Sequence, residues 1–293
     1  MKYKDSFSSC HPAVNFLYFA AVIGFTMCYH HPVTLIVSLL FSIIYSIYLD
    51  GSKTVRFSLV YMIPLALAAI VINPAFNHRG VTILMYLPTG NPLTLESILF
   101  GVSASVMLVS VVMWFRCYSS VMTSDKFMYL FGKIIPSLSL IISMALRFIP
   151  VFKNRFITVS EARKCSNKDS DRKLLTKIKR AIEVTSIVVT WSLENSIETS
   201  DSMKSRGFGR KGRTAYSVFR FEERDKYALI WIMTWGVFVL CGGIAGGFSY
   251  WYYPSLSGID LNVMPVCFQV GFMLLCITPL IINAKEKTAW KNM

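Results

Sequence analysis

The chain has 293 residues, of which 54% are apolar and 16% are charged. Soluble domains carry about 25% charged residues, so this composition argues against an ordinary soluble fold. The 30 Lys and Arg outnumber the 16 Asp and Glu, which gives a formal net charge of +14. A chain that is both strongly apolar and basic is typical of a membrane protein with basic cytoplasmic segments.

Six apolar runs are long enough, or nearly long enough, to cross a bilayer as helices of about 20 residues. None of them contains Asp, Glu, Lys, Arg or His. The predicted fold class is therefore all-α: a polytopic membrane protein with about six spanning helices plus amphipathic cytoplasmic helices. The runs are Ala13–Tyr29, Val33–Leu49, Phe57–Asn73, Ser97–Phe115, Tyr227–Phe248 and Val263–Asn283.

The positive charge is concentrated in one part of the chain. Between Arg147 and Lys226 lie 19 of the 30 cationic residues and 10 of the 16 acidic ones. Since positively charged loops stay in the cytoplasm, this segment is predicted to be cytoplasmic, and one crossing per run then places both termini inside. The predicted outer loops hold a single cationic residue, Arg79. The predicted regions are N-terminal transmembrane helices at 1–126, cytoplasmic helices at 127–225 and C-terminal transmembrane helices at 226–293.

One further apolar run, Phe127–Phe152, does not fit as a crossing. If it spanned the membrane, the basic segment would lie outside and the charge rule would fail. The run also contains charged residues and prolines, and its polar side chains gather on one side of a helical wheel. It is predicted to be an amphipathic helix that skirts the membrane, with a possible kink at Pro136; the alternative is a seventh span.

Two more cytoplasmic helices are expected after this run. The first covers about Val151–Ser166 and stops at Asn167. The second covers Arg172–Arg206 and ends at Gly207, because Gly just past the last turn is the usual left-handed cap. Its apolar residues recur at the three-and-four spacing of one helix face. Small residues repeat on the same helix and predict a close crossing with another helix: Ser192, Ser196 and Ser200.

The residue types exclude several kinds of chemistry. Proton pumps and ion-coupled carriers need ionisable side chains within their spans, and these spans have none. No catalytic or metal-binding motif is present, so no catalytic residue, metal site or cofactor is predicted. Of the histidines, the His30 and His31 pair is interpreted as interface residues, since two ligands make a poor metal site. The seven scattered cysteines are interpreted as small packing residues.

A glycine-rich stretch, Gly207–Thr214, resembles phosphate-binding loops. Such loops need a preceding strand and a following helix whose N-terminal amides face the phosphate. Here the glycines follow a helix, so a solvated basic loop is predicted instead. Nucleic-acid binding is also not expected, because few aromatic residues are interleaved with the charges.

The predicted spans carry no ionisable side chains for proton or ion coupling, and they are joined to long cytoplasmic helices that end in an exposed Arg. This combination suggests a subunit that couples to a separate motor protein. Ser202–Phe208 is similar to the signature A-M-E-x-R-G-[FY], with Met203, Arg206 and Gly207 matching outright. On these residues the chain resembles the transmembrane T component of energy-coupling factor (ECF) transporters, the family that includes the membrane subunit of cobalt uptake systems. Further similar segments, in order, are His11–Pro12, Asn77–Gly80, Gly90–Glu96 and Ser143–Pro150.

The resemblance implies the partners and the place of the chain. Two cytoplasmic ATP-binding subunits would bind the two coupling helices, and a substrate-binding membrane protein (S component) would pack on this chain in the bilayer. ATP-driven motion would then drive uptake of a vitamin or metal ion across a prokaryotic cell membrane. The chain itself would be a transport subunit without its own ATPase site.

The resemblance also implies two docking motifs, one at the end of each coupling helix. The second motif is Ser205, Arg206 and Gly207. The first aligns with Cys165, Ser166 and Asn167, where this sequence has Ser in place of the expected Arg. Either Arg163 or Lys164 substitutes from one turn back, or that dock is made without a cation.

Two functions from other classes remain as alternatives. A membrane enzyme acting on lipids would use the basic face to attract anionic headgroups. A membrane scaffold would bind proteins other than ATPases. Neither explains the Arg-Gly helix end.

Overall fold

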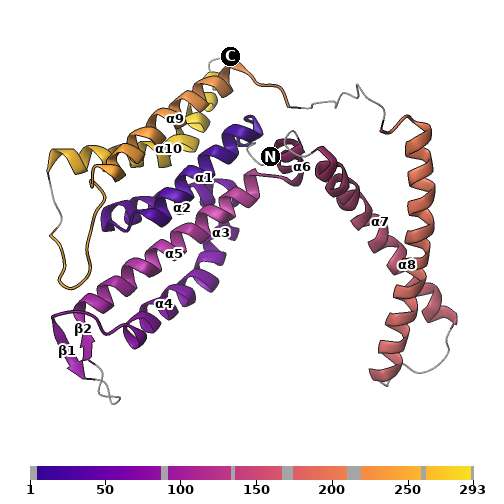
Figure 1. The fold of residues 1–293 in the computed structure, drawn as a ribbon, viewed down its shortest axis with the longest axis horizontal. Helices are drawn as coiled ribbons and strands as arrows, with labels where there is room; N and C mark the ends of the chain where they lie inside the picture. The colour runs from indigo at the N-terminus through magenta and orange to yellow at the C-terminus, as the bar shows by residue number, and fades with distance from the viewer. Residues whose placement is uncertain are drawn as a thin grey trace. The chain divides into compact units, whose positions relative to one another are not determined.

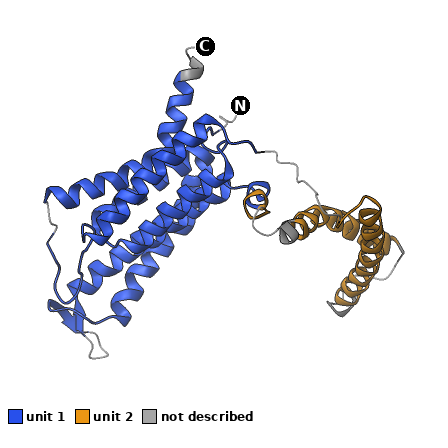
Figure 2. Ribbon diagram, turned by 45° about the horizontal axis from the view of Figure 1, so that its top comes forward, with its two compact units in different colours: residues 1–127, 219–293 blue, residues 128–218 orange. Residues whose placement is uncertain are grey.

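The computed structural model describes residues 5–86, 92–132, 136–166, 174–209, 219–258 and 262–291. The chain divides into two compact units, which are described separately. Unit 1 comprises residues 1–127 and 219–293, and unit 2 comprises residues 128–218 (Figure 2).

Unit 1 is a bundle of long helices (Figure 1). Its first half contains α1 (Pro12–Cys28), α2 (Pro32–Asp50), α3 (Ser52–Phe57), the π-helical turn η1 (Ser58–Met62) and α4 (Ile63–Phe76). A hairpin of β1 (Ile83–Tyr86) and β2 (Pro92–Thr94) leads to α5 (Leu95–Val121). The chain returns to the bundle with α9 (Glu223–Ile244) and α10 (Val263–Lys291). A short helix, α6 (Ser124–Gly132), starts in unit 1 and continues into unit 2.

The helices of unit 1 confirm the all-α polytopic membrane fold. Within the described residues, five helical segments are long and apolar enough to cross a membrane, with α3, η1 and α4 counted as one. The sixth predicted span is α1, which is equally apolar but has 17 residues. Within the described residues, neither α6 nor the helix that follows it meets these criteria.

Two helices of unit 1 begin in the same way, with a His-Pro pair. The ring Nδ1 of His11 accepts a hydrogen bond from the Ala13 amide at 3.2 Å, and the ring Nδ1 of His31 accepts one from the Val33 amide at 3.3 Å. The proline that follows each His needs no amide partner at the first helical position. These histidines are therefore helix caps, and no group of three or more possible metal ligands occurs in the described residues.

The core of unit 1 satisfies its polar groups internally, as membrane helices require. Trp114 is fully buried and donates its indole N–H to the Ser38 hydroxyl at 2.9 Å. The buried Tyr18 hydroxyl donates to the Cys276 carbonyl at 3.0 Å. The packing interpretation of the cysteines holds for three of the seven, since the exposed ones do not pack in the core. The buried cysteines are Cys10, Cys117 and Cys276.

One end of unit 1 carries the hairpin, where the sequence analysis predicted only an outer loop around Arg79 (Figure 1). Glu96 is buried, and its carboxylate accepts hydrogen bonds from the Thr82 amide at 3.1 Å and the Thr82 hydroxyl at 2.8 Å. Gly80 has φ +150°, and a Cβ there would lie 2.5 Å from the Glu96 carboxylate. The Glu96 carboxylate and a bond from the Leu95 amide to the Thr82 carbonyl at 3.0 Å thus fix the hairpin to the start of α5.

At the opposite end, the N-terminal segment is clasped between helices. Asp5 accepts hydrogen bonds from the Tyr45 hydroxyl at 2.9 Å and from the Asn283 amide at 2.5 Å. Phe7 is fully buried in the aromatic core. The buried Lys126 ammonium donates to the carbonyls of Ser8 and Val121. This arrangement, the N-terminal clasp, ties the start of α6 to α2, α5 and α10.

Replacing Lys126 by Met is expected to destabilise the clasp by about 2 kcal/mol, since two buried carbonyl oxygens lose a charged donor. The melting temperature of the purified chain should fall by several degrees. Burial lowers the pKa of Lys126 from 10.5, so the unfolded chain keeps this proton to higher pH than the folded chain. The stability advantage of the native chain over the variant should therefore grow as the pH rises toward 10.5.

The exposed Lys53 provides the control for this substitution, because Lys53→Met removes the same charge without a buried contact. Equal melting temperatures for the two variants would contradict the role of Lys126.

Unit 2 corrects the predicted helix boundaries. Instead of one helix at 127–152 and another at Val151–Ser166, the chain ends α6 at Gly132 and then forms one continuous helix, α7 (Pro136–Ser166). Pro136 starts this helix rather than kinking one, because the first helical position needs no amide donor. Pro150 lies within α7 without ending it. The long helix predicted at Arg172–Arg206 is present as α8 (Leu174–Ser205).

Candidate functional site at the ends of α7 and α8

The two long helices of unit 2 pack against one another in antiparallel directions. Phe152 contacts the Trp191 ring edge-on at 6.1 Å, and the Arg155 guanidinium lies 4.8 Å from the centre of the same ring. Farther along, Arg163 forms an ion pair with Glu183 at 2.5 Å. The later residues of α7 thus meet the earlier residues of α8.

The close helix crossing predicted at the repeated serines is not a contact with α7. Ser196 and Ser200 are exposed, and α8 faces α7 through the neighbouring row that includes Trp191 and Asn195.

The apolar stripe that identified α8 in the sequence is not covered by α7. Ile178, Ile182, Leu193 and Ile197 are each between 56% and 65% exposed. An apolar stripe of this length on one face of a helix is a surface for a membrane or a protein partner.

The end of α8 is formed as predicted, by a glycine cap. Gly207 has φ +79°, and its amide bonds to the Lys204 carbonyl at 3.0 Å. The Phe208 amide reaches back to the Met203 carbonyl at 3.0 Å. These two bonds define a Schellman motif in which Arg206 is the C-cap residue. The last turn of α8 therefore holds the Arg206 backbone in a fixed position.

Arg206 is an exposed cation at this helix end. Its side chain is exposed and forms no ion pair with the described residues. By contrast, Lys204 lies 3.8 Å from Asp201, and the Ser205 hydroxyl donates to the Ser202 carbonyl at 2.8 Å. Ser205 and Gly207 thus shape the helix end, while Arg206 presents a charge to solvent.

The end of α7 offers a weaker cation. Arg163 is engaged by Glu183, so it is not available without breaking that ion pair. Lys164 and Cys165 are exposed, and Lys164 has no ionic partner among the described residues. Ser166 is the last residue of α7, while its side chain and Asn167 lie outside the described residues. Arg163 and Lys164 were the two predicted substitutes for the expected Arg of the first docking motif. Of these, Lys164 is the one without an ion pair among the described residues.

The glycine-rich stretch has no phosphate-cradle geometry in its described part. Gly207 and Gly209 have φ values of +79° and +93° and follow the C-terminus of a helix. Helix C-termini expose carbonyl groups and repel anions, whereas a cradle requires amide groups at a helix N-terminus. The rest of the stretch, 210–214, lies outside the described residues.

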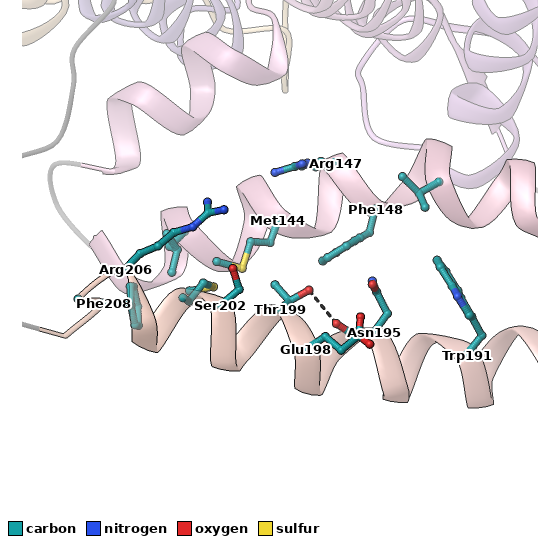
Figure 3. Close-up of a pocket in the computed structure, with 14 residues that line it drawn as sticks. Met144, Arg147, Phe148, Trp191, Asn195, Glu198, Thr199, Ser202, Arg206 and Phe208 are labelled. Atoms are coloured by element: carbon teal, nitrogen blue, oxygen red, sulfur yellow. Dashed lines mark hydrogen bonds between the residues drawn. The ribbon is translucent and has the colours of Figure 1, made fainter.

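A groove of about 1070 Å³ runs between α7 and α8 (Figure 3). The wall formed by α7 is mainly apolar, and the wall formed by α8 is mainly polar. Both Arg147 and Arg206 line it. The sequence analysis did not assign a role to Arg147, although its position in the segment Ser143–Pro150 is a signal that could have drawn attention to it.

The fold and this site define a multi-pass membrane protein that carries a paired-helix unit with an exposed apolar stripe and an exposed arginine at a glycine-capped helix end. The chain belongs to the family described as cobalt transport protein (CbiQ), whose model matches residues 4–216. The resemblance to the transmembrane component of ECF transporters is thereby confirmed.

Three relatives carry the name energy-coupling factor transporter transmembrane protein EcfT. The one from Lactobacillus helveticus is 30% identical over 101 residues, which is 34% of this chain and 36% of the relative. Those from Streptococcus equi and Lactococcus lactis are 26% and 31% identical over 106 and 98 residues. These alignments cover 36% and 33% of this chain and 39% and 37% of the relatives, so each spans little more than a third of the relative's length.

Proposed function

We propose that the chain is the transmembrane coupling subunit of an ECF-type ABC importer. It transmits ATP-driven motion from two cytoplasmic ATP-binding subunits to a substrate-binding membrane protein. The observation that carries this proposal is the end of α8, where a Schellman motif presents Arg206, which has no ion pair among the described residues, in a chain of this family. The names of the relatives, as ECF transporter transmembrane proteins, support the same assignment.

The two ATP-binding subunits dock at the ends of α7 and α8. At the end of α8, Arg206 provides a guanidinium fork that can hold a carboxylate or carbonyl oxygens. At the end of α7, the free cation is Lys164, a point charge with less directional hydrogen bonding. We infer that the two docks differ in strength, with the Arg206 dock the stronger.

The substrate-binding membrane protein binds to the exposed apolar stripe of α8. Side chains such as Ile182 and Leu193 are more than 60% exposed, and burying them against an apolar partner is favourable. The substrate is a vitamin or a metal ion and is recognised by that partner, since the spans of this chain carry no charged ligands.

The importer mechanism requires unit 2 to lie in the cytoplasm of a prokaryotic cell. The positive charge of 147–226 supports this side, since basic segments stay inside. Reporters fused after Lys53 and after Gly209 are expected to read as cytoplasmic, and one fused after Ser255 as external. An external signal at Gly209 would overturn the proposed function.

The chain is expected to have no ATPase activity of its own. Reconstituted alone in nanodiscs, it should neither bind nor hydrolyse ATP, because the glycines near Gly207 expose no amide cradle. Hydrolysis should appear only after the ATP-binding subunits are added. Tight ATP binding by the pure chain, lost on changing Gly212, would contradict this expectation.

A further inference from the structure

Two arginines line the groove between α7 and α8. Arg147 comes from the middle of α7 and Arg206 from the end of α8, and both line the groove. Figure 3 shows Arg206 at one end of the groove and Arg147 farther along α7, beyond Met144. Both side chains are exposed, and neither forms an ion pair with the described residues.

Two like charges that line one groove make it attractive to an anion. The nearest acidic side chain in the lining is Glu198, which forms no ion pair with either arginine. Two guanidinium groups that face one space can bind a single carboxylate through several charge-assisted hydrogen bonds. No acidic side chain in the described part of unit 2 pairs with either arginine, so a partner can supply the anionic group that binds both.

The walls of the groove identify the kind of molecule that carries this anion. The α7 wall is lined by Leu140, Met144, Phe148 and Val151. The α8 wall is lined by the polar residues Asn195, Glu198, Thr199 and Ser202, with Trp191, Met203 and Phe208 toward its two ends. A lipid acyl chain would lie against the hydroxyls and the carboxylate of α8 without bonding them, at a cost in free energy. An amphipathic protein segment can place apolar side chains on α7 and polar ones on α8.

We propose that Arg147 is a second docking residue. Together with Arg206 it forms a binding site in which two guanidinium groups hold one acidic side chain of an ATP-binding subunit. The acidic side chain belongs to an amphipathic segment that fills the groove. This inference rests on the proposed function, because it assigns the partner of Arg206 to the ATP-binding subunit. It adds a residue on α7 to a dock otherwise limited to the end of α8.

The test measures the affinity of the full chain, reconstituted in nanodiscs, for its purified ATP-binding subunits. Arg147→Gln is expected to weaken this affinity by about tenfold, as loss of one partner in a shared charge contact does. Arg147→Lys should recover only part of the affinity, because Lys keeps the charge but lacks the guanidinium fork. Lys153→Gln is the matched control: Lys153 is an exposed cation on α7 outside the groove lining, and its loss should change the affinity less than twofold.

The outcomes separate this inference from the proposed function. If Arg206→Ala releases the ATP-binding subunits and Arg147→Gln does not, the binding site shared by the two arginines is contradicted and the proposed function stands. If neither variant weakens binding, the proposed function itself fails. If Arg147→Gln leaves binding of the ATP-binding subunits unchanged but removes co-purified anionic phospholipid detected by mass spectrometry, the anion is a lipid phosphate. That result contradicts binding of an acidic side chain of the ATP-binding subunit. Elution volume and helical circular dichroism verify that each variant is folded.

Discussion

Arg206→Ala is expected to weaken binding of the ATP-binding subunits by roughly thirtyfold or more and to abolish uptake. Removing one partner of a desolvated charged contact costs about 2 to 5 kcal/mol. The loss should be large at this position because the glycine cap fixes the Arg206 backbone and the C-terminal dipole of α8 already favours a cation. A quantitative pull-down of the ATP-binding subunits with the tagged chain measures the effect.

Two controls belong to this experiment. Ser166→Ala removes only a neutral hydroxyl at the end of α7, whose hydrogen bond is worth about 1 kcal/mol, so retention should fall far less. Lys204→Ala removes a neighbouring cation of α8 that is near Asp201, and this charge is not expected to matter for docking. Equal retention by Arg206→Ala and Ser166→Ala would remove the basis for the docking role of Arg206.

Gly207→Val is expected to weaken the same assembly by about tenfold without removing any charge. The φ value of +79° at Gly207 is unfavourable for a β-branched residue by about 1 to 2 kcal/mol. The strain unwinds the last turn of α8, so the backbone of Arg206 is no longer held in one position. Affinity for the ATP-binding subunits and the uptake rate are the two readouts.

Gly207→Asn is the matched control, because Asn adopts the left-handed conformation more readily than other residues. It should retain most of the affinity that Gly207→Val loses. If Asn and Val are equally damaging, the contribution of Gly207 is contact with the partner rather than backbone conformation.

Much of unit 1 could be predicted from the sequence because lipid imposes a simple rule. A run such as Val33–Leu49 must be helical in a bilayer, since every backbone group has to be bonded internally. Hydrophobicity alone therefore located α2 (Pro32–Asp50) to within one residue at each end. The hairpin after α4 was missed because it lies beyond the spans and is fixed by a long-range contact, from Glu96 to Thr82.

The glycine cap of α8 was also predictable because it depends on a single local preference. Gly207 is the residue type that adopts a positive φ at no steric cost. The pairing of Arg163 with Glu183 was not predictable, since it depends on how two helices cross. The same limit applies to Arg147, whose relation to Arg206 arises only from the packing of α7 on α8.

Proline placement explains the remaining error in unit 2. Pro136 was interpreted as a kink within one helix, whereas it is the first residue of α7. A proline has the same preferred φ in both settings, so its residue type alone does not distinguish a helix start from a kink. Pro150 lies within α7, and a helix boundary had been expected next to it at 151.

Native mass spectrometry of the complex gently extracted from its own membrane tests the central claim most directly. The proposed function predicts one copy of this chain with two ATP-binding subunits and one further membrane protein that binds the substrate. Raising the salt concentration should release the ATP-binding subunits first, because their docks depend on exposed charges. Isolation of the chain alone, or only with proteins that do not bind ATP, would contradict the claim.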